Sequence, residues 1–355
     1  MSSAPLRVAI LGLHHDHVWT ILQELLPLAG DVSLIAAADP EPALRYKFER
    51  LYGSTTRVGA RSYDDYNALL DSEAGRLDAV YLYGSNRLSS QLALEALSRG
   101  LHVLVEKPMA VNAAEATAML EAARTAQRRL MINWPFVWWP QLQHALNLTL
   151  KENRIGRPFQ VNYRAAHEGI VEMGHSHYFA AWAEDPHLAG GGALIDYCCY
   201  GAVLARVILG TPAAVTGLCG NLCKTYLKVE DNAVIVMQYP NAMAIAQGSW
   251  TQHGKIGAYT PTIHGETGTF LIEPRIGGRL FHADDTYQSG VEVAVPELPS
   301  HLRNATSHFL WAIAHPDEPL HPLCDPQNCR DAAAILDAGN ASARDKSQLV
   351  TLSLG

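Results

Sequence analysis

The first 133 residues alternate short apolar runs with segments of helical character, and this alternation constrains the fold more than any other feature of the sequence. Runs suited to buried strands lie at residues 6–11, 32–38, 79–83, 102–105 and 130–133. Helical segments are expected at residues 17–28, 43–52, 63–70, 89–99 and 112–126. Alternating strands and helices are typical of a parallel sheet with helices on both faces. We therefore predict an α/β domain with a doubly wound parallel sheet over residues 1–134.

After Trp134 the pattern changes to strands at short spacing. Strands are expected at residues 159–166, 214–218, 233–239, 243–250 and 269–273. The turn Tyr239-Pro240-Asn241 joins two of them, as in a hairpin. This spacing predicts an α+β domain over residues 135–355, built on a large, mainly antiparallel open sheet. A last helix, near residues 329–344, has an apolar face that could pack on either domain.

Composition excludes several classes of protein. The chain is 48% apolar and 17% charged, a globular balance that excludes a disordered or fibrous chain. Its formal charge of −8 and its lack of a basic run argue against nucleic-acid binding. We find no apolar stretch of the roughly 18 residues that a membrane span needs, and the first strand begins too early for a signal peptide. The 6 cysteines form no Cys-x-x-Cys pair, so we expect reduced thiols in a cytoplasmic protein.

The turn after the first strand lies where a dinucleotide-binding Rossmann domain places its glycine fingerprint. Only the first glycine of Gly-x-Gly-x-x-Gly is present, as Gly12, and His14 and His17 occupy the other two positions. Asp39 ends the second strand, where a carboxylate accepts hydrogen bonds from the adenosine ribose and repels a 2′-phosphate. We therefore expect NAD rather than NADP, bound by Gly12, His14, His15 and Asp39. The other interpretation of Asp39 is a turn residue.

The imidazoles of this turn also suit a metal ion. His14 and His17 could share a helix face, with Asp16 as an oxygen ligand. The alternatives are that the histidines line the cleft or are structural. We expect no metal, because the pyrophosphate of the cofactor passes here and a cation would compete for the same space. Asn86 follows the strand at residues 79–83 and is expected beside the cofactor, at the carboxyl edge of the sheet.

Several motifs further along the chain resemble those of the Gfo/Idh/MocA oxidoreductase family, the relatives of glucose–fructose oxidoreductase and inositol dehydrogenase. Glu106-Lys107-Pro108 follows a buried strand, and Trp182-Ala183-Glu184-Asp185-Pro186 leads to Gly190-Gly191-Gly192-Ala193-Leu194-Ile195-Asp196. Residues 263–270 resemble the Gly-x-x-Gly strand turn of the family's C-terminal domain, and residues 330–343 its closing helix. The resemblance covers essentially the whole chain in order.

The resemblance implies roles for particular residues. The family's Glu-Lys-Pro lysine reaches the substrate hydroxyl and the nicotinamide ribose, which implies that Lys107 is catalytic and that Glu106 and Pro108 contact the cofactor. The family's catalytic helix carries Asp-x-x-x-His or Asp-x-x-x-Tyr, which implies Asp196 and Tyr200. A phenol accepts a proton more readily beside an ammonium, so we expect Lys107 to lower the pKa of Tyr200. Without the motif, Tyr200 would be interpreted as a buried helix tyrosine.

Aromatic and polar residues are expected on the substrate side. Trp134 and Trp138 lie at the domain junction, where they could stack on sugar C–H faces or pack as a hinge. His175 and His177 alternate as two cleft-facing residues would, and could bind a polyhydroxy substrate, supply an acid or share a metal ion. Trp182, within the family motif, is also expected to contact the substrate.

Together these features predict an NAD-dependent dehydrogenase or reductase acting on a sugar, cyclitol or related polyol. One alternative is a lyase or glycosidase that retains NAD and uses transient oxidation to drive elimination. A second is a non-catalytic ligand-binding member of the family. An open sheet needs cover on one face, so we also expect a homodimer or homotetramer. Neither nucleic acid nor a membrane is expected as a partner.

Overall fold

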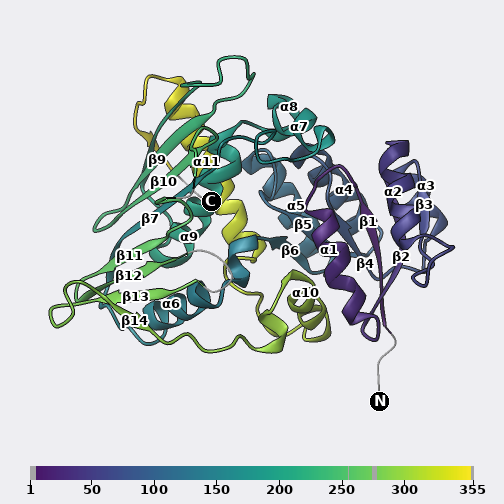
Figure 1. The fold of residues 1–355 in the computed structure, drawn as a ribbon, viewed down its shortest axis with the longest axis horizontal. Coiled ribbons are helices and arrows are strands. Elements are labelled where there is room, and N and C mark those ends of the chain that lie inside the picture. The colour runs from purple at the N-terminus through teal and green to yellow at the C-terminus, as the bar shows by residue number, and fades with distance from the viewer. Residues whose placement is uncertain (1–4, 255, 274–277, 353–355) are drawn as a thin grey trace.

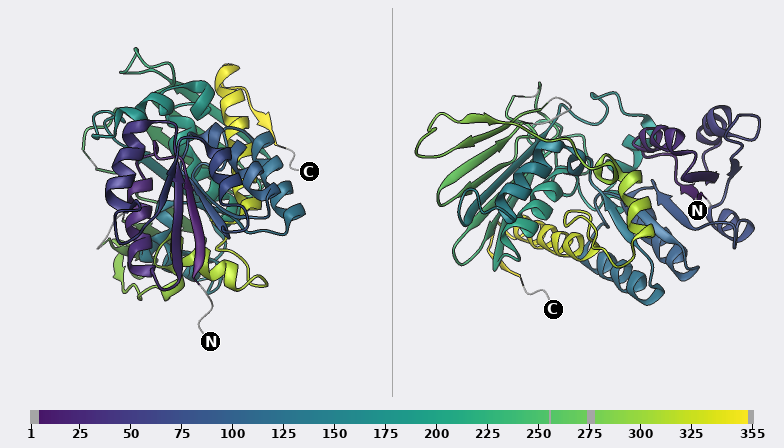
Figure 2. Two further views of the ribbon diagram at one scale, coloured as in Figure 1. Left: turned by 90° about the vertical axis from the view of Figure 1, so that its right-hand side faces the viewer. Right: turned by 90° about the horizontal axis from the view of Figure 1, so that it is seen from below.

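The computed structural model describes residues 5–254, 256–273 and 278–352, and its first sheet has six parallel strands in the order β3-β2-β1-β4-β5-β6 (Figure 1). The strands are β1 (Leu6–Leu11), β2 (Val32–Ala38), β3 (Arg61–Tyr63), β4 (Ala79–Leu82), β5 (His102–Glu106) and β6 (Leu130–Asn133). The helices between them are α1 (Val18–Leu25), α2 (Pro42–Tyr52), α3 (Tyr66–Ser72), α4 (Asn86–Ser98) and α5 (Ala113–Ala126). They lie on both faces of the sheet (Figure 2), which confirms the doubly wound α/β fold.

Side-chain caps explain where the sequence expectations missed helix boundaries. α4 begins at Asn86 rather than residue 89, because the hydroxyl of Ser85 accepts the backbone N–H of Leu88 at 3.3 Å. α3 begins at Tyr66 after an Asp65 cap, and the short strand β3 occupies the residues just before it. β3 was missed because three residues show no recognisable period.

The second sheet has nine strands in the order β14-β13-β12-β11-β7-β10-β9-β8-β15. Its strands are β7 (Pro158–Ala166), β8 (Ala214–Gly220), β9 (Asn232–Gln238), β10 (Met243–Ser249), β11 (Thr262–Gly265), β12 (Gly268–Ile272), β13 (Leu280–Ala283), β14 (Val291–Val293) and β15 (Val350–Thr351). Only the β7–β10 pair is parallel among the pairs described. The expected large, mainly antiparallel sheet is therefore present.

Helices of this half lie on one face of the nine-stranded sheet and leave the other face without a helix (Figure 2). The helices on the covered face are α6 (Pro140–Leu150), α9 (Cys199–Leu209) and α11 (Pro326–Arg344), beside a π-helical turn at Leu194–Cys198. α7 (His177–Ala183) and α8 (Pro186–Ala189) lie against each other, with α8 also against α4, and α10 (Ala305–Ala314) lies against α1. The bare face carries exposed apolar side chains, including Leu218 and Met243, which are 62% and 49% exposed.

α11 joins the two halves of the molecule. It contacts helix α9 and strand β8 in the second domain and helix α5 in the first domain. Its Asp337 accepts the backbone N–H of Ala113, the first residue of α5, at 2.8 Å. Two residues later, Gly339 lies so close to Gly217 of β8 that a Cβ on Gly217 would meet the Gly339 carbonyl oxygen at 2.1 Å. The last helix therefore packs on both domains.

One helical segment corrects an expectation. Residues Pro186–Leu209 form a run long and apolar enough, by composition, to cross a membrane. The sequence expectation of no such stretch is wrong, because the segment includes the glycine-rich turn as well as the helix that follows it. Within the fold, 78% of the most apolar window of this segment is buried, as expected of a core helix.

Candidate active site

The turn between β1 and α1 is shaped by Gly12. Its φ is +95°, and a Cβ there would meet the backbone N of Gly84, beyond β4, at 2.5 Å. Only glycine tolerates both conditions. The retained first glycine is thus required where the ends of β1 and β4 approach each other, at the carboxyl edge where ligands bind in such sheets.

Asp39, at the end of β2, is enclosed by its own chain. Its Oδ2 accepts the Leu13 N–H at 2.7 Å and lies 3.0 Å from Nδ1 of His14, while its Oδ1 accepts the Glu41 N–H at 2.9 Å. Burial alone would raise the pKa of Asp39, but the bonds from His14 and Leu13 lower it. A carboxylate offers about four acceptor positions, so one remains for a ribose hydroxyl beside these three partners.

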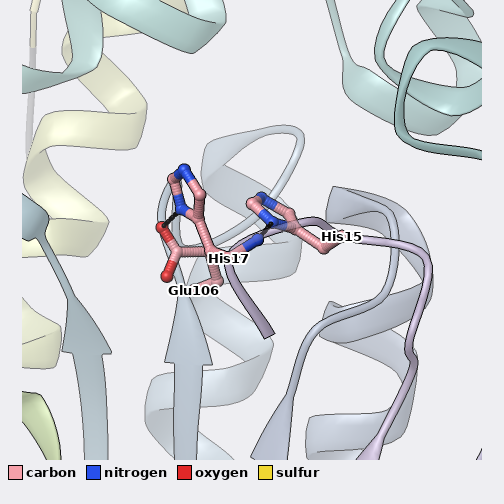
Figure 3. Close-up of side chains that lie close together, drawn as sticks. All are labelled: His15, His17 and Glu106. Carbon is pink, nitrogen blue, oxygen red and sulfur yellow. Dashed lines mark hydrogen bonds and ion pairs between the residues drawn. The ribbon is translucent and has the colours of Figure 1, made fainter. Parts of the chain in front are cut away.

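His15 and His17 converge with Glu106 rather than with the metal ligands considered from the sequence (Figure 3). Nδ1 of His17 lies 3.1 Å from Oε1 of Glu106, the last residue of β5, and Asn133 Nδ2 donates to the other oxygen of Glu106 at 2.8 Å. His15 is buried, and burial followed by the charge of His17 lowers its pKa well below the usual value.

Asp16 is directed away from these histidines. It links the turn between β1 and α1 to the second domain through contacts with Ser176 and His175. Its carboxylate accepts the N–H and the hydroxyl of Ser176 at 2.7 and 2.6 Å and lies 3.0 Å from Nδ1 of His175. The set His14, His17 and Asp16 is therefore not assembled. His175 faces the first turn, whereas His177 is exposed at the start of α7. The two do not form the expected cleft-facing pair, because a helix begins between them.

Lys107 and Asp196 meet at the junction of the two domains. Nζ of Lys107, which follows β5 and precedes a cis peptide bond to Pro108, lies 2.6 Å from Oδ1 of Asp196. Burial would lower the pKa of Lys107, but the carboxylate overrides it and raises that pKa above its ordinary value. Burial would raise the pKa of Asp196, but the charge of Lys107 lowers it. The pair therefore carries both charges at neutral pH.

Two aromatic residues from the second sheet complete this pair. Trp250, just after β10, donates its indole N–H to Oδ2 of Asp196 at 3.1 Å. His167, just after β7, stacks on Trp250 and accepts the Gly169 N–H through Nδ1 at 2.8 Å. Burial lowers the pKa of His167 to about 4, so its imidazole is neutral at pH 7. Neither residue was among the predicted site residues; the only sequence signal was their position at strand ends.

Tyr200 lies one helical turn after Asp196, packed among aromatic rings. Its ring contacts Trp134, Phe136 and Tyr163, with Nζ of Lys107 5.0 Å from the ring centre. Its pKa is raised well above 10, first by burial and then by neighbouring acidic groups. The expected lowering of this pKa by Lys107 is therefore wrong, because the lysine charge is already compensated by Asp196.

The tryptophans of the domain junction both pack against neighbouring side chains. Trp134 is 1% exposed, packs on Tyr200, and directs its indole N–H toward the sulfur of Cys329 at 3.4 Å. Trp138 donates to the side-chain oxygen of Asn133 at 3.0 Å and packs on His308. Of the two interpretations offered by the sequence, the packed hinge describes Trp134. A cluster of aromatic residues in the sequence is compatible with a sugar-binding site and with a packed hinge. Only the burial of the side chains in the fold distinguishes the two.

A small cavity lies between the domains. Lys107, Asp196, Trp250, Trp182 and Asn86 are among its lining residues. The indole N–H of Trp182 is buried there and has no hydrogen-bond partner among the described residues. Asn86 donates instead to the carbonyl of Ala189 at 2.8 Å, and thereby holds α8 over the cavity.

These residues provide a test of whether a nicotinamide dinucleotide fits. The carboxylate of Asp39, the ammonium of Lys107 and the unpartnered donor of Trp182 suit its ribose, nicotinamide ribose and carboxamide groups. The cavity has a volume of about 20 Å³, room for about one water molecule. The donor set fits a nicotinamide dinucleotide.

Two family models match the chain. Residues 6–134 match an oxidoreductase family with an NAD-binding Rossmann fold, and residues 144–271 match the GFO/IDH/MocA C-terminal domain. These are the two halves of one family, in the order expected from the motifs around Lys107 and Asp196.

Named relatives act on carbohydrates. The chain is 27% identical to dTDP-3,4-didehydro-2,6-dideoxy-alpha-D-glucose 3-reductase of Actinomadura kijaniata, over 96% of each protein. It is 32% identical to D-xylose 1-dehydrogenase (NADP(+)) 2 of Haloferax volcanii, but over only 43% of this chain and 44% of that protein. The solved structure of aldose-aldose oxidoreductase from Caulobacter crescentus, complexed with glycerol, aligns over 98% of this chain and 100% of that one, with a TM-score of 0.80 and 21% identity. At that identity, the structural likeness supports the fold alone.

Proposed function

Because the chain belongs to the Gfo/Idh/MocA oxidoreductase family, we propose that it transfers a hydride between NAD and a hydroxyl- or keto-bearing carbon of a sugar, cyclitol or related polyol. The observation that carries the proposal is the buried Lys107–Asp196 pair, 2.6 Å apart, on the wall of the interdomain cavity. Relatives named for sugar substrates support the substrate class.

The bound dinucleotide would supply the acceptor or donor of the hydride, and the chain's own residues would handle the oxygen and its proton. Lys107 keeps its charge at neutral pH and would donate to the reacting oxygen, which stabilises negative charge as it develops there. Asp196 holds the ammonium, and Trp250 in turn holds the second oxygen of Asp196. The hydrogen bonds fix the direction of the lysine before the substrate arrives.

We assign proton exchange to Tyr200, on its motif position and its ring 5.0 Å from Nζ of Lys107. A phenol with a raised pKa is protonated at neutral pH, so its natural role is that of an acid in the reduction of a carbonyl. In the opposite direction it would accept the substrate proton only while Lys107 stabilises the phenolate. This assignment favours reduction near neutral pH and oxidation at alkaline pH.

Three further features belong to the proposal. NAD is preferred to NADP, because the Asp39 carboxylate stands at the end of β2 and repels a 2′-phosphate. The bare face of the nine-stranded sheet is covered by a second copy of the chain, in a homodimer or homotetramer. The protein works in the cytoplasm, which agrees with all 6 cysteines being free thiols.

The proposal is tested by incubating the protein with NAD or NADH and a panel of sugars, inositols and their keto forms. Net formation or loss of NADH, abolished in Lys107→Met, is the expected result. Turnover of a glycoside without net NADH would replace the proposal with elimination by retained NAD. Binding of a sugar without turnover would replace it with a ligand-binding role.

A further inference from the structure

Three metal-ligating side chains converge where the first turn meets the end of β5 (Figure 3). His15 and His17 come from the turn before α1, and Glu106 ends β5, 89 residues further along the chain. One ligand atom from each lies within 4.8 Å of the others, and only the His17 side chain, 38% exposed, reaches solvent to any extent. No other group of this kind was found among the described residues.

The charge of Glu106 is poorly compensated. Its side chain is 2% exposed and contacts the ring of His17 and the amide of Asn133. The Lys107 ammonium, on which the charge of Glu106 also acts, is paired with Asp196. The charge of Glu106 acts on other neighbouring groups. Burial raises the pKa of Glu24 to about 7 and also raises the pKa of Tyr83, and the charge of Glu106 is the second cause in both cases. A buried carboxylate is costly unless a cation or several donors accompany it. The site therefore favours an added positive charge.

The donor set matches a particular class of ion. Two imidazoles and one carboxylate are the protein ligands of many zinc sites that keep one position open. Tetrahedral coordination with bonds of about 2.0–2.1 Å places neighbouring ligand atoms about 3.3 Å apart. Nδ1 of His17 and Oε1 of Glu106 are already 3.1 Å apart.

We propose that His15, His17 and Glu106 bind one divalent transition-metal ion of the zinc class, beside the path of the cofactor diphosphate. The site stands on its own residues, whereas the role in cofactor binding rests on the proposed function. That role follows from the missing glycines. The second and third glycine positions of the fingerprint are histidines. In addition, Asp16 and Glu106 place two carboxylates near the N-terminus of α1, where a diphosphate is expected. A divalent ion offsets this charge, and its open position accepts a phosphate oxygen.

Other nearby charges do not prevent binding. The ammonium of Lys107 opposes a second cation near His15, but it is paired with Asp196. The Asp16 carboxylate is engaged by Ser176 and His175 and adds negative charge at the turn. Binding replaces the hydrogen bond between Nδ1 of His17 and Oε1 of Glu106 at 3.1 Å. If His15 binds the ion through Nδ1, the contact from the His17 N–H at 3.3 Å is also lost. The sequence expectation of no metal also covered His15 and His17, but it grouped them with His14 and Asp16, which the fold places at Asp39 and Ser176.

The test titrates Zn²⁺ into metal-stripped, nucleotide-free full-length protein by calorimetry. The matched variants are His17→Ala and Glu106→Gln, with His14→Ala as the control, because it removes an imidazole of the same turn that lies outside the cluster. Mg²⁺ is the second probe, since it prefers oxygen ligands and should not bind. Thermal unfolding of each variant verifies that it is folded. His17 is half exposed, so its variant should fold even if Glu106→Gln does not.

The proposal predicts one Zn²⁺ per chain in the parent and in His14→Ala, and affinity at least about 100-fold weaker in folded His17→Ala. Zinc should also tighten the binding of NAD to the parent and not to His17→Ala. Equal zinc binding by the parent and His17→Ala would overturn the site, as would no stoichiometric binding. Zinc that displaces NAD would overturn the role. Zinc binding at the site with no affinity for NAD or NADP would instead refute the proposed function and leave the site in place.

Discussion

Removing both charges of the Lys107–Asp196 pair should destabilise the protein by less than the sum of the losses from removing each charge alone. The two groups lie 2.6 Å apart, and their side chains are 6% and 27% exposed. Breaking a buried pair from one side costs about 3–5 kcal/mol, because the remaining charge is left in the interior. The partial exposure of Asp196 places Asp196→Asn at the lower end, about 3 kcal/mol, and Lys107→Met in the same range. The double variant should lose less than the sum by at least about 1 kcal/mol.

The assay is urea denaturation of the parent, both single variants and the double variant at pH 7, followed by tryptophan fluorescence and circular dichroism. All three variants should lose turnover. The double variant should therefore be inactive although its loss of stability is smaller than the sum of the two single losses. The pKa of Asp196 is lowered in the fold, so the stabilisation is present above about pH 4 and is lost as the pH falls through the lowered value. The pKa of Lys107 is raised, so on the alkaline side the stabilisation holds up to about pH 10 and is lost above the raised value. Additive losses in the double variant, or a single-variant loss below about 0.5 kcal/mol, would refute this reasoning.

Three further predictions concern Tyr200, Asp39 and the bare sheet face. Tyr200→Phe should lower kcat by about 10²–10⁴ with the true substrate while leaving NAD affinity unchanged, and a near-normal kcat would place the proton-exchanging group elsewhere. Asp39→Ser should narrow the preference for NAD over NADP in titrations, because it removes the charge that repels a 2′-phosphate; tighter NADP binding by the parent would contradict this assignment. Light scattering at micromolar concentration should give at least twice the chain mass of 38.7 kDa, since exposed Leu218 and Met243 lie on a face that no helix covers, and a monomer mass would count against the oligomer.

Much of the fold could be predicted because its determinants are local. Buried strands such as β1 and β4 are continuous apolar runs, and the cap of α5 by Asn112 was recognisable from the sequence and is present, with its side chain accepting the Glu115 N–H at 2.8 Å. Lys107 and Asp196 were named from motifs and lie in contact. The motif identified the residues, and the structure supplied their distance.

The contacts that were missed join distant parts of the chain. Asp16 and His175 are separated by 159 residues, and His17 and Glu106 by 89. No periodicity in a single sequence specifies such pairs, so the histidines of the first turn could be grouped only with their neighbours. The pKa of Tyr200 was misjudged for a related reason. Burial by Trp134, Phe136 and Tyr163 outweighs a lysine whose charge Asp196 already compensates.

The most direct measurement of the central claim follows the substrate hydrogen itself. The polyol that gives turnover would be prepared with deuterium on its reacting carbon, and the cofactor would be isolated after reaction and analysed by mass spectrometry. Hydride transfer with net oxidation predicts one deuterium in each NADH released, in step with the keto product. Turnover that leaves the released cofactor unlabelled, with the deuterium retained in the product or exchanged into water, would contradict the account.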